Sequence, residues 1–354
     1  MSSFSMNKSK KTGIGIVGLG SISTTHAEAI NNLDDAELVA ACSRSEVNRN
    51  LFKQKFNVPV YADYEEFLSH NNLDVVTICT PSGSHLDFGK LAAKAGKHLV
   101  IEKPIEISVE RGRELLKHCS QNGVQLAVIY QNRFIDGVQQ MKQAVTAGEI
   151  GTPIMARASV KWFRDQDYYS ESGWRGTLKM DGGGAVINQA IHTVDLLIWM
   201  MGEITTLSAY TEKLTHPGIE AEDNAVAVMK FESGALGVFE ASTSIVPAQS
   251  RSLEINGSEG TALLDGDQFQ LIRKGGKTES KEKSKKGAES PLSGVKAADH
   301  QVQYDKIVNA LKKNETPIVS GEESLQSLAV VEAIYRSAGS GKRISPGSIL
   351  FQGS

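Results

Sequence analysis

The sequence predicts an α/β protein with two domains, the first built on a parallel sheet and the second on an open, mostly antiparallel sheet. Up to about residue 130, short apolar runs alternate with amphipathic stretches of helical length, which is typical of strands joined by crossover helices. Beyond that point, longer runs with alternating apolar and polar residues follow one another, which is typical of antiparallel strands. The chain has 354 residues, more than one domain usually contains.

The first apolar run is followed by a glycine motif, Gly18-Leu19-Gly20-Ser21-Ile22-Ser23. Residues 13–17 before it show no polar alternation, so we expect a strand buried on both faces. The glycines allow a tight turn and the close approach of a pyrophosphate, and the following amides begin a helix whose positive end faces the phosphate. Ser23 is a mild departure from the Gly or Ala of this dinucleotide fingerprint, because Ser is also small. The predicted cofactor contacts are Gly18, Gly20, Ser21 and Ile22.

The second strand, residues 37–42, ends at Ser43-Arg44, where a dinucleotide-binding fold usually places the acidic residue that binds the adenosine ribose. Ser43 and Arg44 are therefore predicted cofactor contacts. A guanidinium in this place can pair with a 2′-phosphate, and this favours NADP slightly over NAD. The alternative is that Arg44 is a solvated loop residue or stacks on the adenine of either cofactor.

Three further strands, residues 73–79, 97–101 and 125–129, end in polar or proline-containing turns. In an open parallel sheet the ligand lies outside the carboxyl ends of the strands, so we expect these turns to face the cofactor. The predicted contacts are Thr80, Pro81, His85, Glu102, Lys103 and Gln131. For His85, helix capping or packing is an equally good explanation; for Lys103 the alternative is a surface lysine, which the adjacent Pro104 makes less plausible. Helices are expected at 25–33, 46–56, 64–69, 86–95 and 109–121.

The second domain is expected over residues 131–346, after a first domain at 13–130. A helix at 138–147 precedes a strand at 153–162, and strands at 224–231 and 235–242 form a hairpin around Glu232-Ser233-Gly234. Shorter strands are expected at 251–256, 261–264 and 268–273. The Lys/Glu/Ser/Gly tract at 274–293 is interpreted as an exposed, mobile loop, and amphipathic helices at 302–313 and 325–337 are placed at the domain periphery. Residues 1–12 are expected to be a disordered tail, and 347–354 a tail or tag remnant.

One predicted helix, residues 182–199, begins with a run of three glycines and carries an apolar stripe and a polar stripe. The polar stripe consists of Asn188, His192 and Asp195, at positions i, i+4 and i+7. Three polar groups in line on an otherwise apolar helix are costly to bury unless they face a site or pair with one another. We therefore predict that this helix contributes to the active site.

Hydride transfer from an alcohol needs a base that works near neutral pH and a group that polarises the carbinol oxygen. His192 suits the first role and Lys103 the second. Aromatic and arginine residues between the first strand of the second domain and the helix of His192 suit a sugar substrate, because aromatics stack on sugar faces and Arg binds carboxylate or phosphate. An equally good alternative is that they stabilise the loop or a subunit interface. The predicted substrate contacts are Trp162, Arg164, Tyr168, Trp174, Arg175, Asn188 and His192.

These motifs together resemble the Gfo/Idh/MocA family of oxidoreductases over residues 13–344. The resemblance is carried by the glycine motif, Cys79-Thr80-Pro81 with His85, Glu102-Lys103-Pro104 and the stretch 183–192. It implies a Rossmann domain, an open-faced sheet domain that mediates a homodimer or homotetramer, and NAD(P)-dependent oxidation or reduction of sugars and cyclic polyols. It also implies that Lys103 and His192 are the catalytic pair and that the bond between Lys103 and Pro104 is cis.

The chain departs from the family pattern at Asn188, where many members carry Asp. Asn can bind a substrate hydroxyl, so it is assigned a positioning role, but it cannot accept a proton. The Asn-Gln-x-x-His variant, with Trp174-Arg175-Gly176-Thr177 before it, resembles the branch of UDP-N-acetyl-2-amino-2-deoxyglucuronate 3-dehydrogenases, and similar sequences occur among dehydrogenases of free or anhydro sugars.

The composition of the chain limits which partners, metals and cellular locations we expect. The net charge is −3, from 38 basic and 41 acidic residues, and does not indicate a nucleic-acid or membrane partner. The 3 cysteines show neither metal-ligand spacing nor a disulfide framework, and residues 1–12 lack the apolar stretch of a signal peptide. We therefore expect a cytoplasmic enzyme with no metal. A non-catalytic dinucleotide-sensing protein and a redox-assisted hydrolase that retains its cofactor remain as alternatives.

Overall fold

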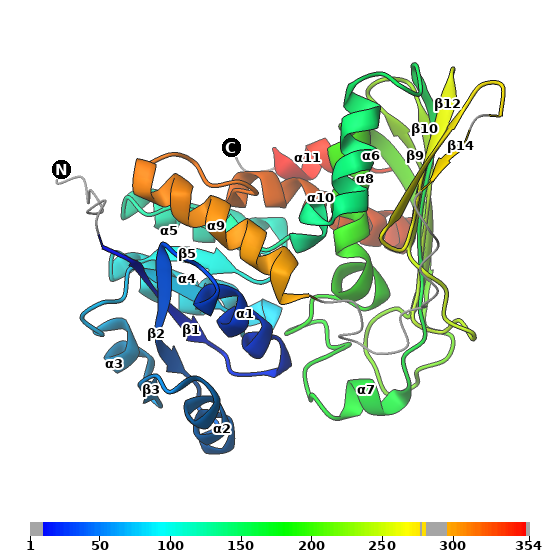
Figure 1. Ribbon diagram of the computed structural model, residues 1–354. Helices are drawn as coiled ribbons and strands as arrows, with labels where there is room; N and C mark the ends of the chain where they lie inside the picture. Colours follow the sequence, from blue (N-terminus) through cyan, green and yellow to red (C-terminus); the bar gives the residue numbers. More distant parts are fainter. Residues whose placement is uncertain (1–9, 277, 281–295, 352–354) are drawn as a thin grey trace. The chain divides into compact units, whose positions relative to one another are not determined.

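The computed structural model describes residues 10–276, 278–280 and 296–351, and it divides the chain into two compact units (Figure 1). The first unit comprises Met1–Gln131 and Val295–Ser324, and the second comprises Asn132–Gly294 and Leu325–Ser354. Within the described residues, no helix is both long and apolar enough to cross a membrane.

The first unit is built on a six-stranded sheet in the order β3-β2-β1-β4-β5-β6, with every neighbouring pair parallel. The strands are β1 Thr12–Val17, β2 Ala36–Cys42, β3 Val60–Tyr61, β4 Val75–Ile78, β5 His98–Ile101 and β6 Leu126–Val128. The strand order reverses between β1 and β4, and this switch point is where open parallel sheets bind their ligands. The expected parallel sheet is therefore confirmed.

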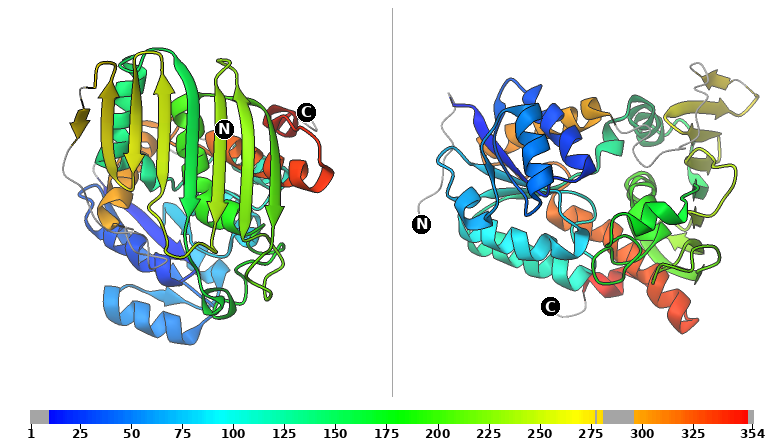
Figure 2. Two further views of the ribbon diagram at one scale, coloured as in Figure 1. Left: turned by 90° about the vertical axis from the view of Figure 1, so that its right-hand side faces the viewer. Right: turned by 90° about the horizontal axis from the view of Figure 1, so that it is seen from below.

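Helices cover both faces of this sheet, with α1 and α9 on one face and α4 and α5 on the other (Figure 2, right). The helices of this unit are α1 Ser21–Asn31, α2 Glu46–Phe56, α3 Tyr64–Leu68, α4 His85–Lys94, α5 Val109–Gln121 and α9 Ala297–Lys313. Thr12, at the end of the expected N-terminal tail, already belongs to β1 and is fully buried.

Helix α9 does not lie at the periphery of the second domain, as the amphipathic pattern suggested. It returns to the first unit and packs against α1, where Tyr304, Ile307 and Val308 are buried in the same core as Ile14 and Ile30. An amphipathic stripe shows that a helix is packed but not against which element, and this is why the sequence pattern placed α9 incorrectly.

The second unit is built on an eight-stranded sheet in the order β14-β13-β12-β11-β7-β10-β9-β8. The strands are β7 Pro153–Lys161, β8 Ile204–Glu212, β9 Asn224–Phe231, β10 Leu236–Ser242, β11 Ser252–Gly257, β12 Gly260–Asp265, β13 Gln268–Arg273 and β14 Thr278–Ser280. Every neighbouring pair is antiparallel except β7 with β10, which confirms the mostly antiparallel sheet. Among the described residues of this unit, no helix lies in front of the sheet face that Figure 2 (left) shows.

Helices of the second unit lie behind this sheet or connect its strands. They are α6 Asp136–Thr146, α7 Gln166–Ser170, α8 Ile191–Met201, α11 Pro346–Leu350 and all but the first turn of α10 Gly321–Ser340, which begins in the first unit. Strand β8 and helix α7 were not anticipated, and β14 lies inside the tract expected to be a loop, of which residues 277 and 281–293 fall outside the described residues. Helix α11 occupies part of the expected C-terminal tail, because Ile349 is buried.

The helix predicted at 182–199 is divided. Residues Ala185–Ala190 form a π-helical segment with wider turns, and α8 begins at Ile191. This division changes which side chains share a face, and it matters for the site described next.

Candidate functional site

The glycine turn between β1 and α1 has the geometry of a phosphate-binding loop. Gly18 has a φ of +90°, and a Cβ added there would lie 2.7 Å from the backbone of Cys79 and Thr80. Gly20 is exposed and nothing lies within 4 Å of a Cβ added to it, so the backbone here is open to a ligand. Ser23 donates its hydroxyl to the carbonyl of Gly20 at 2.6 Å, and no side chain caps the N-terminus of α1. These features fit the pyrophosphate of a dinucleotide.

Two neighbouring turns at the same sheet edge are joined by His85. Its ring nitrogens lie 3.0 Å from the carbonyl oxygen of Pro104 and 2.9 Å from that of Thr80. His85 is fully buried, so the structure gives it the role of holding the turn after β4 against the turn after β5. The peptide bond between Lys103 and Pro104 is cis, as the family resemblance implied.

Glu102 belongs to a buried polar cluster with His26 and His300. Its carboxylate accepts a hydrogen bond from His26 Nε2 at 2.8 Å and from the amide of Lys103 at 3.1 Å, and His300 Nε2 lies 3.9 Å away. Burial alone would raise the pKa of Glu102, but the hydrogen bond from His26 and the proximity of His300 hold this pKa well below its usual value. These three side chains are the group of described residues whose arrangement could hold a metal ion.

At the end of β2, Ser43 is half-buried and Arg44 is exposed. The guanidinium of Arg49 donates to the carbonyl oxygens of both residues, at 2.8 and 2.9 Å. The sequence reasoning missed Arg49, which adds a second positive charge beside the predicted ribose site. Gln131, the last predicted cofactor contact, is buried at the end of the first unit's N-terminal segment.

In the second unit, Glu222 holds the start of the π-helical segment that leads to His192. Its carboxylate accepts hydrogen bonds from the amides of Gly184 and Val186 at 2.9 and 2.8 Å, and from the Tyr335 hydroxyl at 3.1 Å. Burial raises the pKa of Glu222 to about 7. Asn188 and His192 are half-buried, whereas Asp195 is only 1% exposed. Asp195 pairs with Arg133 through two 2.7 Å hydrogen bonds, so it does not share the role expected for the polar stripe.

The structure gathers the predicted aromatic and arginine residues into one cluster around Tyr168. Arg175 lies over the Tyr168 ring at 4.2 Å, and Arg164 lies over the same ring at 5.4 Å and over Trp162 at 5.2 Å. Trp174 is more distant, 5.8 Å from the Arg175 guanidinium. Arg164 is only 3% exposed, and burial lowers its pKa. The described residues offer it no carboxylate within ion-pair distance.

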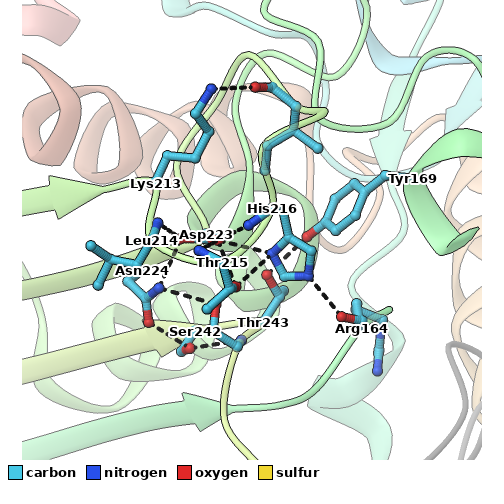
Figure 3. A network of polar contacts seen from close by, with 12 residues as sticks. Arg164, Tyr169, Lys213, Leu214, Thr215, His216, Asp223, Asn224, Ser242 and Thr243 are labelled. Carbon is cyan, nitrogen blue, oxygen red and sulfur yellow. Dashed lines mark hydrogen bonds and ion pairs between the residues drawn. The ribbon is translucent and has the colours of Figure 1, made fainter. Parts of the chain in front are cut away.

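A second buried network fixes the backbone of this cluster (Figure 3). His216 bridges the Asp223 carboxylate, 2.9 Å from Nδ1, and the carbonyl oxygen of Arg164, 2.8 Å from Nε2. Asp223 also accepts hydrogen bonds from backbone amides, among them that of Leu214 at 2.7 Å, and its pKa is held well below the usual value despite burial. Sequence reasoning missed this pair, because a lone His and a distant Asp carry no local pattern.

The fold and the two sites define a dinucleotide-binding enzyme of two parts. One part offers a phosphate loop with Lys103 at the edge of a parallel sheet; the other offers His192, Asn188 and an aromatic, positively charged cluster. Residues 12–130 match the model of an oxidoreductase family with an NAD-binding Rossmann fold, and residues 142–345 match the C-terminal alpha/beta domain of the same family. The chain belongs to the Gfo/Idh/MocA family and is an NAD-binding oxidoreductase.

Named relatives span almost the whole chain. D-Apiose dehydrogenase of Paraburkholderia graminis is 30% identical over 340 residues, covering 93% of this chain and 88% of the relative. Myo-inositol 2-dehydrogenase of Thermotoga maritima is 28% identical, covering 92% and 95%. Among solved structures, the WlbA dehydrogenase of Bordetella pertussis in complex with NADH and UDP-GlcNAcA is 35% identical with a TM-score of 0.83, covering 95% of this chain and 99% of that one.

Proposed function

We propose that the protein transfers a hydride between a nicotinamide cofactor and a secondary alcohol of a sugar, and that a sugar carrying an anionic group, such as a nucleotide sugar, is preferred to a neutral sugar or cyclic polyol. The observation that carries this preference is Arg164, a buried guanidinium without a carboxylate partner among the described residues, lying between aromatic rings. Such a cation is costly to bury unless an anion joins it. The relative solved with UDP-GlcNAcA supports the same class of substrate.

We assign the proposed chemistry to three side chains. The cofactor, when bound, supplies the hydride acceptor, and the alcohol loses its hydride and its hydroxyl proton together. His192 takes the proton, because imidazole works as a base near neutral pH. The ammonium of Lys103 donates a hydrogen bond to the substrate oxygen and stabilises its developing negative charge. Asn188 holds a neighbouring hydroxyl.

The first test is absorbance at 340 nm with NAD⁺ or NADP⁺ against nucleotide sugars, including UDP-GlcNAcA, and against free sugars and inositols. Turnover restricted to anionic nucleotide sugars supports the proposal, and equal turnover of inositols refutes the anionic preference. Lys103→Ala and His192→Ala are expected to lower kcat by at least about 100-fold. Lys94→Ala, an exposed lysine on α4, is the matched control. No change in absorbance with either group of substrates would favour the two alternatives, a non-catalytic dinucleotide-sensing protein or a redox-assisted hydrolase that retains its cofactor.

The cofactor preference is a separate proposal. Arg44, supported by Arg49, would bind a 2′-phosphate and favour NADP, whereas the relative described above was solved with NADH. Arg44→Ala is expected to weaken NADPH binding about tenfold or more while leaving NADH binding unchanged. Lys53→Ala, an exposed lysine of α2, controls for loss of net charge. Equal binding of NADPH by the wild type and Arg44→Ala would refute the phosphate assignment.

We also propose that a second copy of the chain covers the open face of the eight-stranded sheet. Outward-facing side chains of β8, β9 and β10 leave a contiguous apolar patch exposed, with Tyr210 78%, Val226 51%, Val228 58% and Leu236 53% accessible. Contiguous apolar patches of this kind mark interaction surfaces, and a flat sheet face can pair with its own copy about a twofold axis. Val228→Glu is expected to reduce the molar mass by light scattering; Val47→Glu, 67% exposed on α2, is the control.

A cytoplasmic location is proposed from the cysteines. Cys42, Cys79 and Cys119 are all free, and a reducing compartment keeps thiols in this state.

A further inference from the structure

A chain of hydrogen bonds in the second unit links the buried Arg164 to the buried Asp181. Arg164 Nη2 donates to Gln189 Oε1 at 2.9 Å, and Gln189 Nε2 donates to Asn188 Oδ1 at 2.5 Å. Asn188 Nδ2 then donates to Asp181 Oδ1 at 2.6 Å. The other carboxylate oxygen of Asp181 accepts the amide of Gly176 at 2.8 Å. Arg164 is 3% exposed and Asp181 is 1% exposed, so both charged ends are removed from water.

The direction of this chain is determined by its ends. A guanidinium can only donate hydrogen bonds and an ionised carboxylate can only accept them. Both amides between them must therefore present oxygen toward Arg164 and nitrogen toward Asp181, and flipping either amide would break two contacts. The Asn188 side-chain oxygen therefore points toward Tyr168, whose hydroxyl donates to it at 3.3 Å, and the side-chain nitrogen points away from Tyr168.

Asp181 also explains the departure at position 188. A carboxylate at that position would face the Asp181 carboxylate at about the 2.6 Å that now separates Asn188 Nδ2 from Asp181 Oδ1. Two carboxylates at this separation cannot both ionise. The two positions therefore need one amide and one carboxylate, which we call the matched pair. In this chain the carboxylate is Asp181 and the amide is Asn188.

The chain holds the side chain of Arg164 in one orientation. Nη1 donates to the carbonyl of Phe163 at 2.8 Å and Nη2 is used by Gln189. Nε is buried, and no described residue accepts a hydrogen bond from it. This N–H group lies within the cluster of Trp162 and Tyr168, and it is a buried guanidinium donor for which no described residue supplies an acceptor.

We propose that Asp181 is a positioning residue for substrate binding: through Asn188 and Gln189 it orients Arg164, whose Nε donates to the anionic group of the substrate. The substrate role rests on the proposed function, whereas the matched pair of Asp181 and Asn188 does not. The two parts are therefore tested by different measurements.

The matched pair is tested by melting temperature against pH in Asp181→Asn, Asn188→Asp and the double exchange. In Asn188→Asp the two carboxylates share one proton, so one pKa is raised in the folded state and stability is lost as pH rises from about 5 to 8. The melting temperature of Asn188→Asp is expected to fall further below wild type across this range, and the double exchange is expected to remove the extra slope. Asn50→Asp makes the same chemical change at an exposed position of α2, where water screens the new charge from its neighbours. A slope in Asn188→Asp equal to that of Asn50→Asp would overturn the pairing.

The positioning role is tested by kinetics in Asp181→Asn. We expect KM for the anionic sugar to rise at least tenfold, with the dissociation constant of the dinucleotide unchanged. Asp167→Asn, at an exposed position on α7, is the matched control. An unchanged KM in a well-folded Asp181→Asn overturns the positioning role. A confirmed pH slope without turnover of any sugar would instead retain the matched pair and refute the proposed function.

Discussion

Glu222 makes the stability of the second unit depend on pH. Its pKa is raised from 4.5 to about 7 because burial disfavours the ionised form, although two amides and a hydroxyl donate to it. For an acid whose pKa is higher in the folded than in the unfolded state, stability is complete below the unfolded value and is lost as pH rises through the folded value. A difference of about 2.5 units corresponds to roughly 3 kcal/mol lost between about pH 4.5 and 7.5.

The perturbation is Glu222→Gln, which keeps the shape of the side chain and removes its charge. The assay is the free energy of unfolding of the second unit from denaturant titrations between pH 5 and 8, or the melting temperature, which should change by roughly 5–10 °C for this energy. The variant is expected to lose the part of the pH dependence that Glu222 causes. It also places an amide N–H opposite a backbone N–H, which lowers stability equally at every pH by about 1–3 kcal/mol.

A matched variant separates the charge from the substitution itself. Glu232→Gln changes an exposed glutamate at the turn between β9 and β10. It should leave the pH dependence of the wild type unchanged. If Glu222→Gln and the wild type lose the same free energy between pH 5 and 8, the buried carboxylate is ionised without cost and the reasoning is refuted.

Buried contacts lead to three further predictions, on dinucleotide binding, stability and thiol reactivity. Gly18→Ala should weaken dinucleotide binding more than tenfold, measured by NADH fluorescence, because its Cβ would lie 2.7 Å from the backbone of Cys79 and Thr80 in the turn after β4; unchanged affinity would contradict the close approach. Asp195→Asn should destabilise the second unit by about 3–5 kcal/mol in denaturant titration, because Arg133 loses its buried counter-charge. Cys42 and Cys119 should resist a thiol reagent at pH 8 in the native protein, because burial raises their pKa values to about 11 and 12; rapid labelling of either would show that it is accessible.

The first unit was largely predictable from the sequence, because its signals are local. Each parallel strand is a short apolar run, and a ligand site follows from where such strands end, so the turns at Gly18, Thr80 and Lys103 could be placed without coordinates. The cluster of His26, Glu102 and His300 could not, because its members are far apart in the sequence and α9 carries no mark of the element it packs against.

The helix of His192 shows a second reason why the sequence alone did not predict the site. An α-helical spacing puts Asn188 and Asp195 on one stripe, but the π-helical segment Ala185–Ala190 has wider turns and separates them. Asp195 pairs with Arg133 instead, and Asn188 pairs with Asp181, which lies before the glycines and outside the helical pattern. The substitution of Asn for the family's Asp at 188 was the one signal that could have led to Asp181.

The return of residues 295–324 to the first unit makes both units discontinuous in sequence, since the chain crosses from one unit to the other three times. A gene fragment ending at residue 131 would therefore encode an incomplete dinucleotide-binding domain that exposes the apolar surface normally covered by Tyr304, Ile307 and Val308. Recombination between relatives that preserves both units must exchange this internal segment together with the N-terminal segment. A single crossover at the apparent boundary would combine a helix from one parent with a core from the other.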